Sequence, residues 1–313
     1  MRIIAAVEEA AGIRLLKSLA KGPHEVVAVL ATPPEAGAPA SNAWNVAASL
    51  GLSLWPARTV RDPMFATMLA DLEPDVLLNA HSLHIIHASL LKVPRYGAYN
   101  LHPGPLPRYA GLNAPSWAIY HGEAQHGVTL HRMDSGVDTG PIVSQEIFDI
   151  TPEDTGISLS GKCVRLGLRL IDRLLVDLST DPAALILTPT ALEELEYYGR
   201  DIPHEGMMSW EWSGQEIVRF VRACDYYPFP SPWGHPCVDL HGQPLGVVKA
   251  KLLDSSPNGA LGTVVASQNG AVSVVCSDGH IEVTHVYYGD RYSLAADVID
   301  VGTVLADGGF PST

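Results

Sequence analysis

The chain has 313 residues, of which 47% are hydrophobic and 17% charged, and its formal net charge is −14 at pH 7. This composition is that of a globular protein with enough residues for a large core and, by length, for two domains. The negative charge and the dispersed Lys and Arg residues disfavour a nucleic-acid partner held through many phosphate contacts, and no apolar run approaches the roughly 20 residues that span a membrane.

The N-terminal sequence, MRIIAAVEEAAGIRLL, becomes acidic after position 7 and lacks the pattern of a secretory signal, so we expect a cytoplasmic protein. The four cysteines are scattered without a CxxC pair. We therefore expect free thiols, with neither a disulfide framework nor a zinc knuckle.

Short β-rich runs alternate with segments of helical periodicity through the first 180 residues. The pattern predicts strands at 2–7, 26–32, 75–80, 98–102, 127–133 and 140–150, and helices at 12–22, 41–51 (capped by Ser41), 64–73, 85–93, 114–123 and 158–178. Strands that are apolar on both faces and separated by helices indicate an α/β fold with a doubly wound, mostly parallel sheet. Ligands of such sheets bind at the carboxyl ends of the strands.

The pattern changes in the last third of the chain. Residues 181–207 are irregular and rich in Pro, which is typical of a linker. Residues 208–313 contain one predicted helix and then several short strands with Gly and Asn turns between them, a spacing that predicts a smaller C-terminal β-barrel domain of the OB-like kind. The domain boundaries expected from these shifts are 1–180, 181–207 and 208–313.

Two common phosphate-binding motifs are absent. The first strand continues into VEEAAG, where a dinucleotide-binding sheet has GxGxxG, and no GxxxxGK[ST] occurs. The sheet must therefore bind its ligand by other means.

The most informative stretch is YNLHPGPLPRYAG at positions 99–111. Alternate residues of a strand face the same way, so Asn100 and His102 project together from its end. Pro103, Pro105 and Pro107 then prevent the sheet from continuing, because Pro lacks the N–H that a strand ladder needs. We expect Asn100 and His102 to form a polar pair at a crevice.

A second polar element follows the strand predicted at 127–133. The Gly-rich sequence DSGVDTGP contains Asp134 and Asp138, and an acid on this loop can meet Asn100 and His102 in one crevice. Individually, each of these residues could instead be a cap, a turn former or a satisfied core polar group.

An amide, an imidazole and a carboxylate together suit the transfer of a small acyl group to an amine. N–H donors can stabilise the oxyanion that develops on the acyl carbonyl, and a carboxylate can orient the imidazole and accept the proton that the amine loses. There is no GxSxG motif, and Cys163 falls inside a predicted helix, so direct transfer is favoured over a covalent acyl-enzyme.

The motif NLHPGPLPRYAG, followed by Asp-Thr-Gly at 138–140, resembles the signature of the formyltransferases that use 10-formyltetrahydrofolate. The resemblance implies a Rossmann-like catalytic domain over 1–180 and 10-formyltetrahydrofolate as formyl donor. It also implies that Asn100 and His102 polarise the formyl carbonyl and that Asp138 is the acid–base partner. The resemblance further implies cofactor-binding residues around the pterin, which are Leu83, His84, Ile85, Asp134, Ser135 and Gly136.

Departures from this family's pattern bear on the acceptor. The loop ATPPEAGAPASNAW has no Lys or Arg where the tRNA-formylating members have a basic loop, and residues 200–313 hold 13 acidic residues against six Lys and Arg. Where the tRNA, sugar and hydrolase members typically have Ser-Leu-Leu-Pro, this chain has Gly-Pro-Leu-Pro, a form that resembles the formyltransferases found beside natural-product assembly lines. We therefore expect a small-molecule amine as substrate, such as an amino acid, a hydroxyornithine-like side chain or an amino sugar. Methionyl-tRNA formyltransferase, formyltetrahydrofolate hydrolase and a non-catalytic folate-binding module are the alternatives.

Two other groups could have functional roles. His81, His84 and His87 recur every three residues and could bind a metal if they lay on one helix, but the resemblance implies no metal. The aromatic stretch CDYYPFPSPWGHP is either a stiff, core-packed connection or part of an acceptor pocket formed by Tyr226, Tyr227 or Trp233.

Overall fold

The computed structural model describes residues 1–34 and 42–308. The predicted cap Ser41 and most of the base-free loop before it lie outside the described residues. The chain divides into two compact units, which interleave in sequence. The first unit comprises residues 1–111, 126–148 and 161–197, and the second comprises 112–125, 149–160 and 198–313.

The first unit is built on a seven-stranded sheet of order β3-β2-β1-β4-β5-β7-β8. Its strands are β1 (Arg2–Val7), β2 (Glu25–Ala31), β3 (Leu54–Pro56), β4 (Val76–Ala80), β5 (Ala98–His102), β7 (Gln125–Arg132) and β8 (Ile142–Asp149). The pairs from β3 to β5 are parallel, whereas β5 and β7 are antiparallel. The predicted doubly wound, mostly parallel sheet is confirmed.

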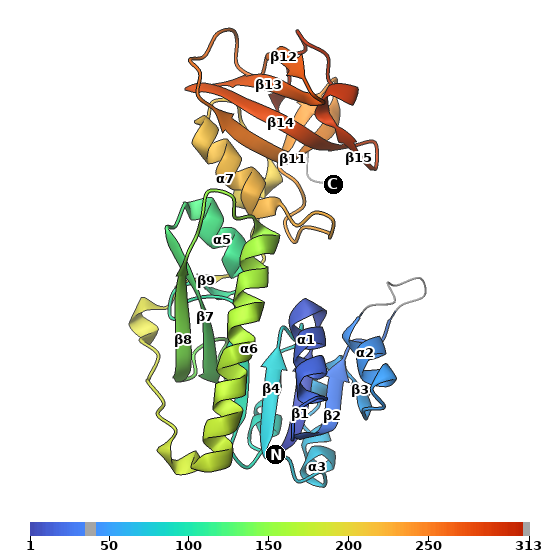
Figure 1. Cartoon of the computed structure of the whole chain (residues 1–313), viewed down its shortest axis with the longest axis vertical. Coiled ribbons are helices and arrows are strands. Elements are labelled where there is room, and N and C mark those ends of the chain that lie inside the picture. The colour runs from blue at the N-terminus through green and yellow to red at the C-terminus, as the bar shows by residue number, and fades with distance from the viewer. Residues whose placement is uncertain (35–41, 309–313) are drawn as a thin grey trace. The chain divides into compact units, whose positions relative to one another are not determined.

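Helices cover both faces of this sheet (Figure 1). Alternation along β1 sends Ile3 and Ala5 to one face and Ile4 and Ala6 to the other, and all four are fully buried. The first face packs against α1 (Glu9–Leu19), α2 (Ala43–Ser49) and the part of α6 (Gly156–Thr180) that belongs to this unit, and the second packs against η1 (Ala57–Arg61), α3 (Phe65–Ala70) and α4 (Ala88–Leu91). Because both faces are covered, polar function is confined to the strand ends.

The second unit contains an antiparallel sheet of order β12-β13-β14-β11-β10-β16, with β15 paired to β14. Its strands are β10 (Cys237–Leu240), β11 (Gln243–Leu253), β12 (Val264–Gln268), β13 (Ala271–Cys276), β14 (Gly279–Tyr288), β15 (Arg291–Leu294) and β16 (Ala306–Asp307). An antiparallel bridge between Thr263 and Val304 joins the two ends of this order. The predicted small barrel is therefore confirmed.

Two helices complete the second unit. The amphipathic α7 (Gly214–Cys224) buries Ile217 and Val221 in the barrel core, and a reciprocal capping box between Ser213 and Glu216 begins it. The helix α5 (Ala114–His121) packs against α7. Short elements occupy the rest of the chain, namely β6 (Ala110–Gly111), η2 (Pro182–Ala184), η3 (Leu192–Glu194), β9 (Tyr197–Tyr198), η4 (Pro203–Gly206) and η5 (Ala295–Asp297).

Some predicted ends differ from the structure. The helix α1 begins at Glu9, three residues before the predicted start at Gly12, and the helix expected at 85–93 is only the short α4. The segment 81–87 before α4 is not helical, so His81, His84 and His87 do not share a helix face. The strands β10, β15 and β16 are too short and mixed in composition to be recognised from the sequence.

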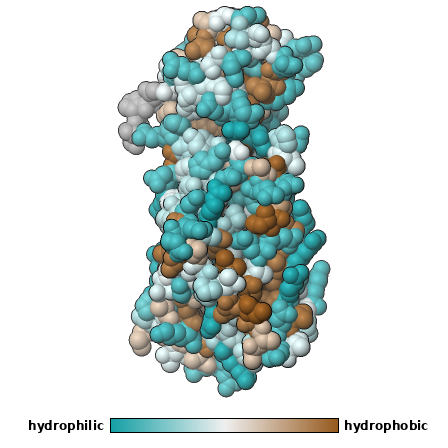
Figure 2. Space-filling model, turned by 90° about the vertical axis from the view of Figure 1, so that its left-hand side faces the viewer, coloured by the Kyte–Doolittle hydropathy of each residue, from teal (hydrophilic) through white to brown (hydrophobic). Residues whose placement is uncertain are grey.

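The surface is mixed in character. On the face shown in Figure 2, hydrophobic residues lie in separate groups between hydrophilic ones. Among the described residues, no helix has both the length and the apolar composition that crossing a membrane requires.

Candidate active site

The candidate site of the first unit forms where β4 and β5 end. These strands are parallel, and Asn79 is in register with Asn100. The side-chain N–H of Asn79 donates to Oδ1 of Asn100 at 2.9 Å. This bond orients the Asn100 amide so that its two N–H groups point away from β4.

The strand β5 ends after His102 for a local reason. Because the prolines prevent strand pairing here, the Thr129 side chain on the neighbouring strand forms hydrogen bonds with backbone groups of this segment. Its hydroxyl donates to the Gly104 carbonyl at 2.7 Å and accepts from the Leu106 N–H at 3.1 Å. The chain then turns at Tyr109, which has a left-handed φ of 59°.

The Asp138 carboxylate lies beside Asn100 and His102 although its loop begins at the opposite end of β5. Because β7 is antiparallel to β5, the loop after Arg132 begins beside Tyr99, at the amino end of β5. The Arg132 N–H donates to the Pro141 carbonyl at 2.9 Å, which closes the loop at its base. Within the loop Asp138 adopts a left-handed φ of 56°, a conformation that Asp tolerates better than most residues. The loop thus returns its carboxylate to Asn100 and His102.

The Asp138 carboxylate is surrounded by polar partners. Its Oδ2 accepts from the Gly111 N–H at 2.8 Å and lies 3.3 Å from Nδ1 of His102. Its Oδ1 accepts from the Asn100 amide at 3.2 Å and lies 3.3 Å from Nε2 of His131. The side chains of His102 and Asp138 are only 3% and 7% exposed. The structure therefore brings together the three predicted catalytic residues, Asn100, His102 and Asp138.

The hydrogen bonds define how His102 is protonated. Its Nε2 is 2.7 Å from the Tyr109 carbonyl oxygen, which can only accept, so Nε2 carries a proton and Nδ1 faces Asp138. Burial lowers the pKa of His102 below its ordinary value, although the Asp138 carboxylate and the Tyr109 carbonyl oppose this effect. At neutral pH the ring is an imidazole whose Nδ1 can take up a proton beside the carboxylate.

Asp138 remains ionised despite its burial. Desolvation would raise its pKa, but the neighbouring His102 and His131 rings and the Gly111 N–H hold the pKa of this carboxyl well below its usual range. A carboxylate with such a low pKa is a weak base. It is better suited to stabilise a proton on His102 than to keep one itself.

Sequence reasoning missed two members of this network. His131 is buried, and its Nε2 accepts from the Asn100 amide at 3.0 Å while Nδ1 is 3.2 Å from the Arg132 carbonyl oxygen. Asn79 orients the Asn100 amide through the hydrogen bond that its side-chain N–H donates to Oδ1 of Asn100. The signal for His131 was its alternation with Thr129 on an otherwise apolar strand, which places two polar side chains on one face.

The predicted pterin segment follows β4 directly. Leu83 and Ile85 are 67% and 72% exposed, an unusual state for large apolar side chains next to a sheet. Between them, Nδ1 of His84 is buried and has no hydrogen-bond partner within the described part of the chain. Uncovered apolar surface next to an unpaired buried polar atom is what a planar, polar-edged ring would require.

The second predicted pterin group lies on the Asp138 loop. Asp134, Ser135 and Gly136 are exposed. Oδ1 of Asp134 accepts from the Gly136 N–H at 3.0 Å and from the Thr139 hydroxyl at 2.6 Å. These contacts form a turn that precedes Asp138.

The histidines considered as metal ligands have separate partners. His81 pairs with Glu9 at 3.3 Å, and His87 caps α4 by accepting from the Ser89 N–H at 3.2 Å. Within residues 1–34 and 42–308, no group of three or more His, Cys, Asp or Glu side chains could hold a metal ion.

The aromatic stretch after α7 lies in the second unit and has two characters. Trp233 is 4% exposed and packs edge-to-face on Trp117, with ring centroids 4.7 Å apart. The Tyr226 hydroxyl is hydrogen-bonded to Ser116 at 2.9 Å. Tyr227, by contrast, is 43% exposed. Core packing therefore explains Trp233, and a role for Tyr227 in binding a ligand stays a prediction.

Two models of the formyl transferase family match this chain. The formyl transferase family model matches residues 1–173, and the model of the formyl transferase C-terminal domain matches residues 202–299. GDP-perosamine N-formyltransferase from Brucella melitensis is 35% identical over 162 residues. That match covers 51% of this chain and 61% of the relative, so the chain spans less than two thirds of the curated relative's length.

Two solved structures show the same fold. The N-formyltransferase from Helicobacter canadensis, in complex with folinic acid and dTDP-3-aminofucose, has a TM-score of 0.68 at 19% identity and covers 90% of this chain and 98% of its own. HypX from Aquifex aeolicus, in complex with tetrahydrofolic acid, has a TM-score of 0.64 at 21% identity and covers 95% of this chain and 46% of its own. Because the family model matches more than half of the residues, the chain belongs to the formyl transferase family.

Proposed function

We propose that this protein transfers a formyl group from 10-formyltetrahydrofolate directly to a primary amine of a small molecule. The observation that carries the proposal is the buried network in which Asp138 contacts both Asn100 and His102, in a chain of the formyl transferase family. Relatives support the donor, since the Helicobacter canadensis structure holds folinic acid and HypX holds tetrahydrofolic acid.

The residues present fit such a donor. The exposed side chains of Leu83 and Ile85 offer apolar surface to the pterin, and His84 contributes an unpaired buried nitrogen to its polar edge. On the other side the turn of Asp134, Ser135 and Gly136 would close over the ring. The donor supplies the formyl group and leaves as tetrahydrofolate.

In the proposed reaction the amine nitrogen bonds to the formyl carbon, the bond from that carbon to N10 of the folate breaks, and the amine proton is finally carried to N10. Asn100 donates to the formyl oxygen as negative charge develops there. Both of its N–H groups are engaged, with Asp138 and His131, so it exchanges one of these bonds for the substrate.

The proton transfer is assigned to His102 and Asp138 acting together. Nδ1 of His102 accepts the proton from the amine, and the ionised Asp138 stabilises the imidazolium that results. The family resemblance implied that His102 polarises the formyl carbonyl and that Asp138 is the acid–base partner; the low pKa of Asp138 favours this shared acid–base role instead.

Within this class we propose an amino sugar carried on a nucleotide as the acceptor. The Brucella melitensis relative is named for GDP-perosamine, and the Helicobacter canadensis structure holds dTDP-3-aminofucose. An amino acid or a hydroxyornithine-like amine would satisfy the same chemistry and belongs in the same screen.

The test is tetrahydrofolate release from 10-formyltetrahydrofolate in the presence of nucleotide-linked amino sugars, amino acids and hydroxyornithine. We expect Asp138→Asn to lower kcat by about 10²–10⁴-fold, the usual range for a lost acid–base group. Asp290→Asn is the matched control, because Asp290 also has a left-handed φ, of 60°, but lies in an exposed turn of the second unit. Wild-type rates for Asp138→Asn would refute the assigned roles, and equal release without any amine would indicate a hydrolase.

A further inference from the structure

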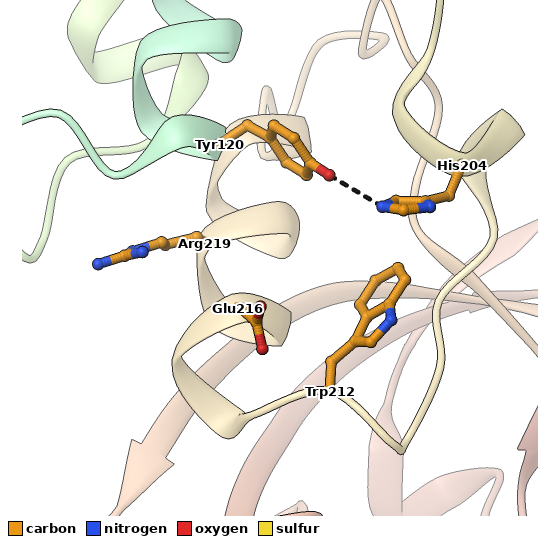
Figure 3. Close-up of a pocket in the computed structure, with 5 residues that line it drawn as sticks. All are labelled: Tyr120, His204, Trp212, Glu216 and Arg219. Carbon is orange, nitrogen blue, oxygen red and sulfur yellow. Dashed lines mark hydrogen bonds between the residues drawn. The ribbon is translucent and has the colours of Figure 1, made fainter.

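The second unit contains a cavity that the proposed reaction does not use (Figure 3). It has a volume of about 290 Å³ and is lined by Tyr120 of α5, His204 of η4, Trp212, and Glu216 and Arg219 of α7. The cavity is at the lower end of the roughly 300–1,000 Å³ typical of ligand pockets, so it suits a molecule much smaller than a folate or a nucleotide-linked sugar.

One end of the cavity is aromatic. The Tyr120 hydroxyl is hydrogen-bonded to Nε2 of His204 at 2.9 Å, and the rings of His204 and Trp212 lie 4.6 Å apart. Behind them the buried Phe220 contacts both Tyr120 and Trp212 edge-on or tilted, at 5.5 and 6.2 Å. Because Tyr120 and Trp212 are only half-buried, part of each ring is left for a further planar group.

The backbone before Trp212 supports this arrangement. His204 and Glu205 are consecutive non-glycine residues with left-handed φ values of 49° and 54°. A left-handed conformation at a non-glycine residue costs free energy, so contacts elsewhere in the fold must hold it in place. Here it directs the His204 ring toward Tyr120 and Trp212 (Figure 3).

The other end of the cavity carries opposite charges. Glu216 and Arg219 are three residues apart on α7, which makes them neighbours on the helix surface. Hydrogen bonds from the Ser213 hydroxyl and N–H to Oε2 lower the pKa of Glu216, so its carboxylate is ionised at neutral pH. The guanidinium of Arg219 packs over the backbone of Gly122, where an added Cβ would come within 2.5 Å of it.

We propose that this cavity binds a free α-amino acid with an aromatic side chain. The side chain lies against Tyr120 and Trp212, the α-ammonium group pairs with Glu216, and the α-carboxylate pairs with Arg219. Two opposite charges one helical turn apart match the two charges of a zwitterion, whereas an amine or a carboxylate alone would leave one of them unmatched.

Calorimetric titration of the full chain with L-phenylalanine and L-tryptophan tests this site. We expect saturable binding of at least one of them, and at least tenfold weaker binding of phenethylamine, which lacks the carboxylate, and of 3-phenylpropionate, which lacks the amine. Equal affinity for either analogue, or no binding of either amino acid at millimolar concentration, would overturn the proposal.

Variants locate the site. Glu216→Gln removes the charge but keeps a residue that can complete the capping box, so we expect an intact helix and at least tenfold weaker binding. Arg219→Gln and Arg219→Lys should weaken binding similarly, because the lysine lacks the planar fork that pairs with a carboxylate. Glu211→Gln and Arg291→Gln change exposed charges outside the cavity and serve as matched controls. If Glu216→Gln and Arg219→Lys fold and bind as the wild type does, the proposal is wrong.

Discussion

At the scale of single residues, the site depends on Asp138 being ionised while buried. Its carboxylate accepts from one backbone N–H and one side-chain amide and lies beside two imidazole rings. The same contacts make His102 a coupled partner, because the carboxylate partly offsets the effect of burial on the imidazole pKa. A change at either residue must therefore alter the titration of the other.

This coupling predicts the pH dependence of the proposed reaction. Since burial lowers the pKa of His102 below 6.5, the imidazole can accept a proton at neutral pH, and kcat/KM should fall only as the pH drops through that lowered value. Asp138→Asn removes the carboxylate that favours the imidazolium, so the pKa of His102 should fall further. The acid limb of the residual kcat/KM should therefore shift to lower pH than in the wild type. Profiles of kcat/KM from pH 4.5 to 8 measure both effects. An acid limb above pH 6.5 in the wild type would contradict the assignment.

The same pKa directions predict the acid sensitivity of the fold. The unfolded chain binds protons at His102 near pH 6.5, and at Asp138 near pH 4, whereas the folded pKa of each group is lower. Protonation therefore favours the unfolded state, and the free energy of unfolding should decrease as the pH falls, first below about 6.5 and again below about 4. Urea unfolding at pH 7.5, 5.5 and 4 measures this. A fold whose stability is constant between pH 7.5 and 5.5 would show that His102 is not held neutral.

At the scale of elements, the ends of β4, β5 and β7 create the site, and α6 supports it from one face. The antiparallel direction of β7 decides where the Asp138 loop begins, and the closure of that loop decides where it returns. Gly140 permits this closure, because an added Cβ would overlap the Arg132 carbonyl oxygen. The close approach of the Gly140 and Arg132 backbones therefore positions the Asp138 carboxylate, which the motif residues alone do not do.

Two glycines of α6 test how closely this helix packs on the sheet. A Cβ at Gly167 would lie 2.5 Å from a methyl carbon of Leu101, the residue between Asn100 and His102, whereas a Cβ at Gly161 would meet nothing within 4 Å. We expect Gly161→Ala to raise the free energy of unfolding by about 0.5–1 kcal/mol through helix propensity.

Gly167→Ala should instead lower the free energy of unfolding, by about 1–3 kcal/mol, because overpacking outweighs the same propensity gain. Urea titrations of both variants, with the wild type, provide the comparison. Equal stabilisation by the two substitutions would mean that α6 can move away from β5 at no cost.

At the scale of the whole molecule, the net charge favours a small-molecule acceptor over tRNA. The chain has a net charge of −14, and its residues 200–313 have 13 acids against six Lys and Arg. A protein that binds tRNA gains affinity by releasing counterions through several basic contacts, and residues 200–313 offer only six Lys and Arg for such contacts. A small acceptor needs only one or two such contacts, which this charge does not prevent.

Binding to methionyl-tRNA should therefore be weak. Fluorescence anisotropy with labelled initiator tRNA at physiological salt should detect no complex below about 10⁻⁴ M, the weak limit of non-specific binding. A micromolar complex whose affinity falls steeply between 50 and 200 mM salt would instead favour the tRNA alternative.

Local patterns in the amino-acid sequence predicted the longer strands and helices, the polar pair at the end of β5 and the acid after β7. These features depend on local signals: period-2 and helical alternation, and prolines that cannot donate to a sheet. The same local signals account for the prediction of a second, antiparallel barrel unit.

How those residues meet depends on the packing of the folded chain. The direction of β7, the return of the Asp138 loop, the insertion of His131 and Asn79 into the network, and the hydrogen bond that holds His204 beside Tyr120 all depend on contacts between residues far apart in the chain. No local pattern encodes such contacts, because the hydrogen bond or ring contact that each side chain makes depends on backbone positions fixed by the packing of the whole unit.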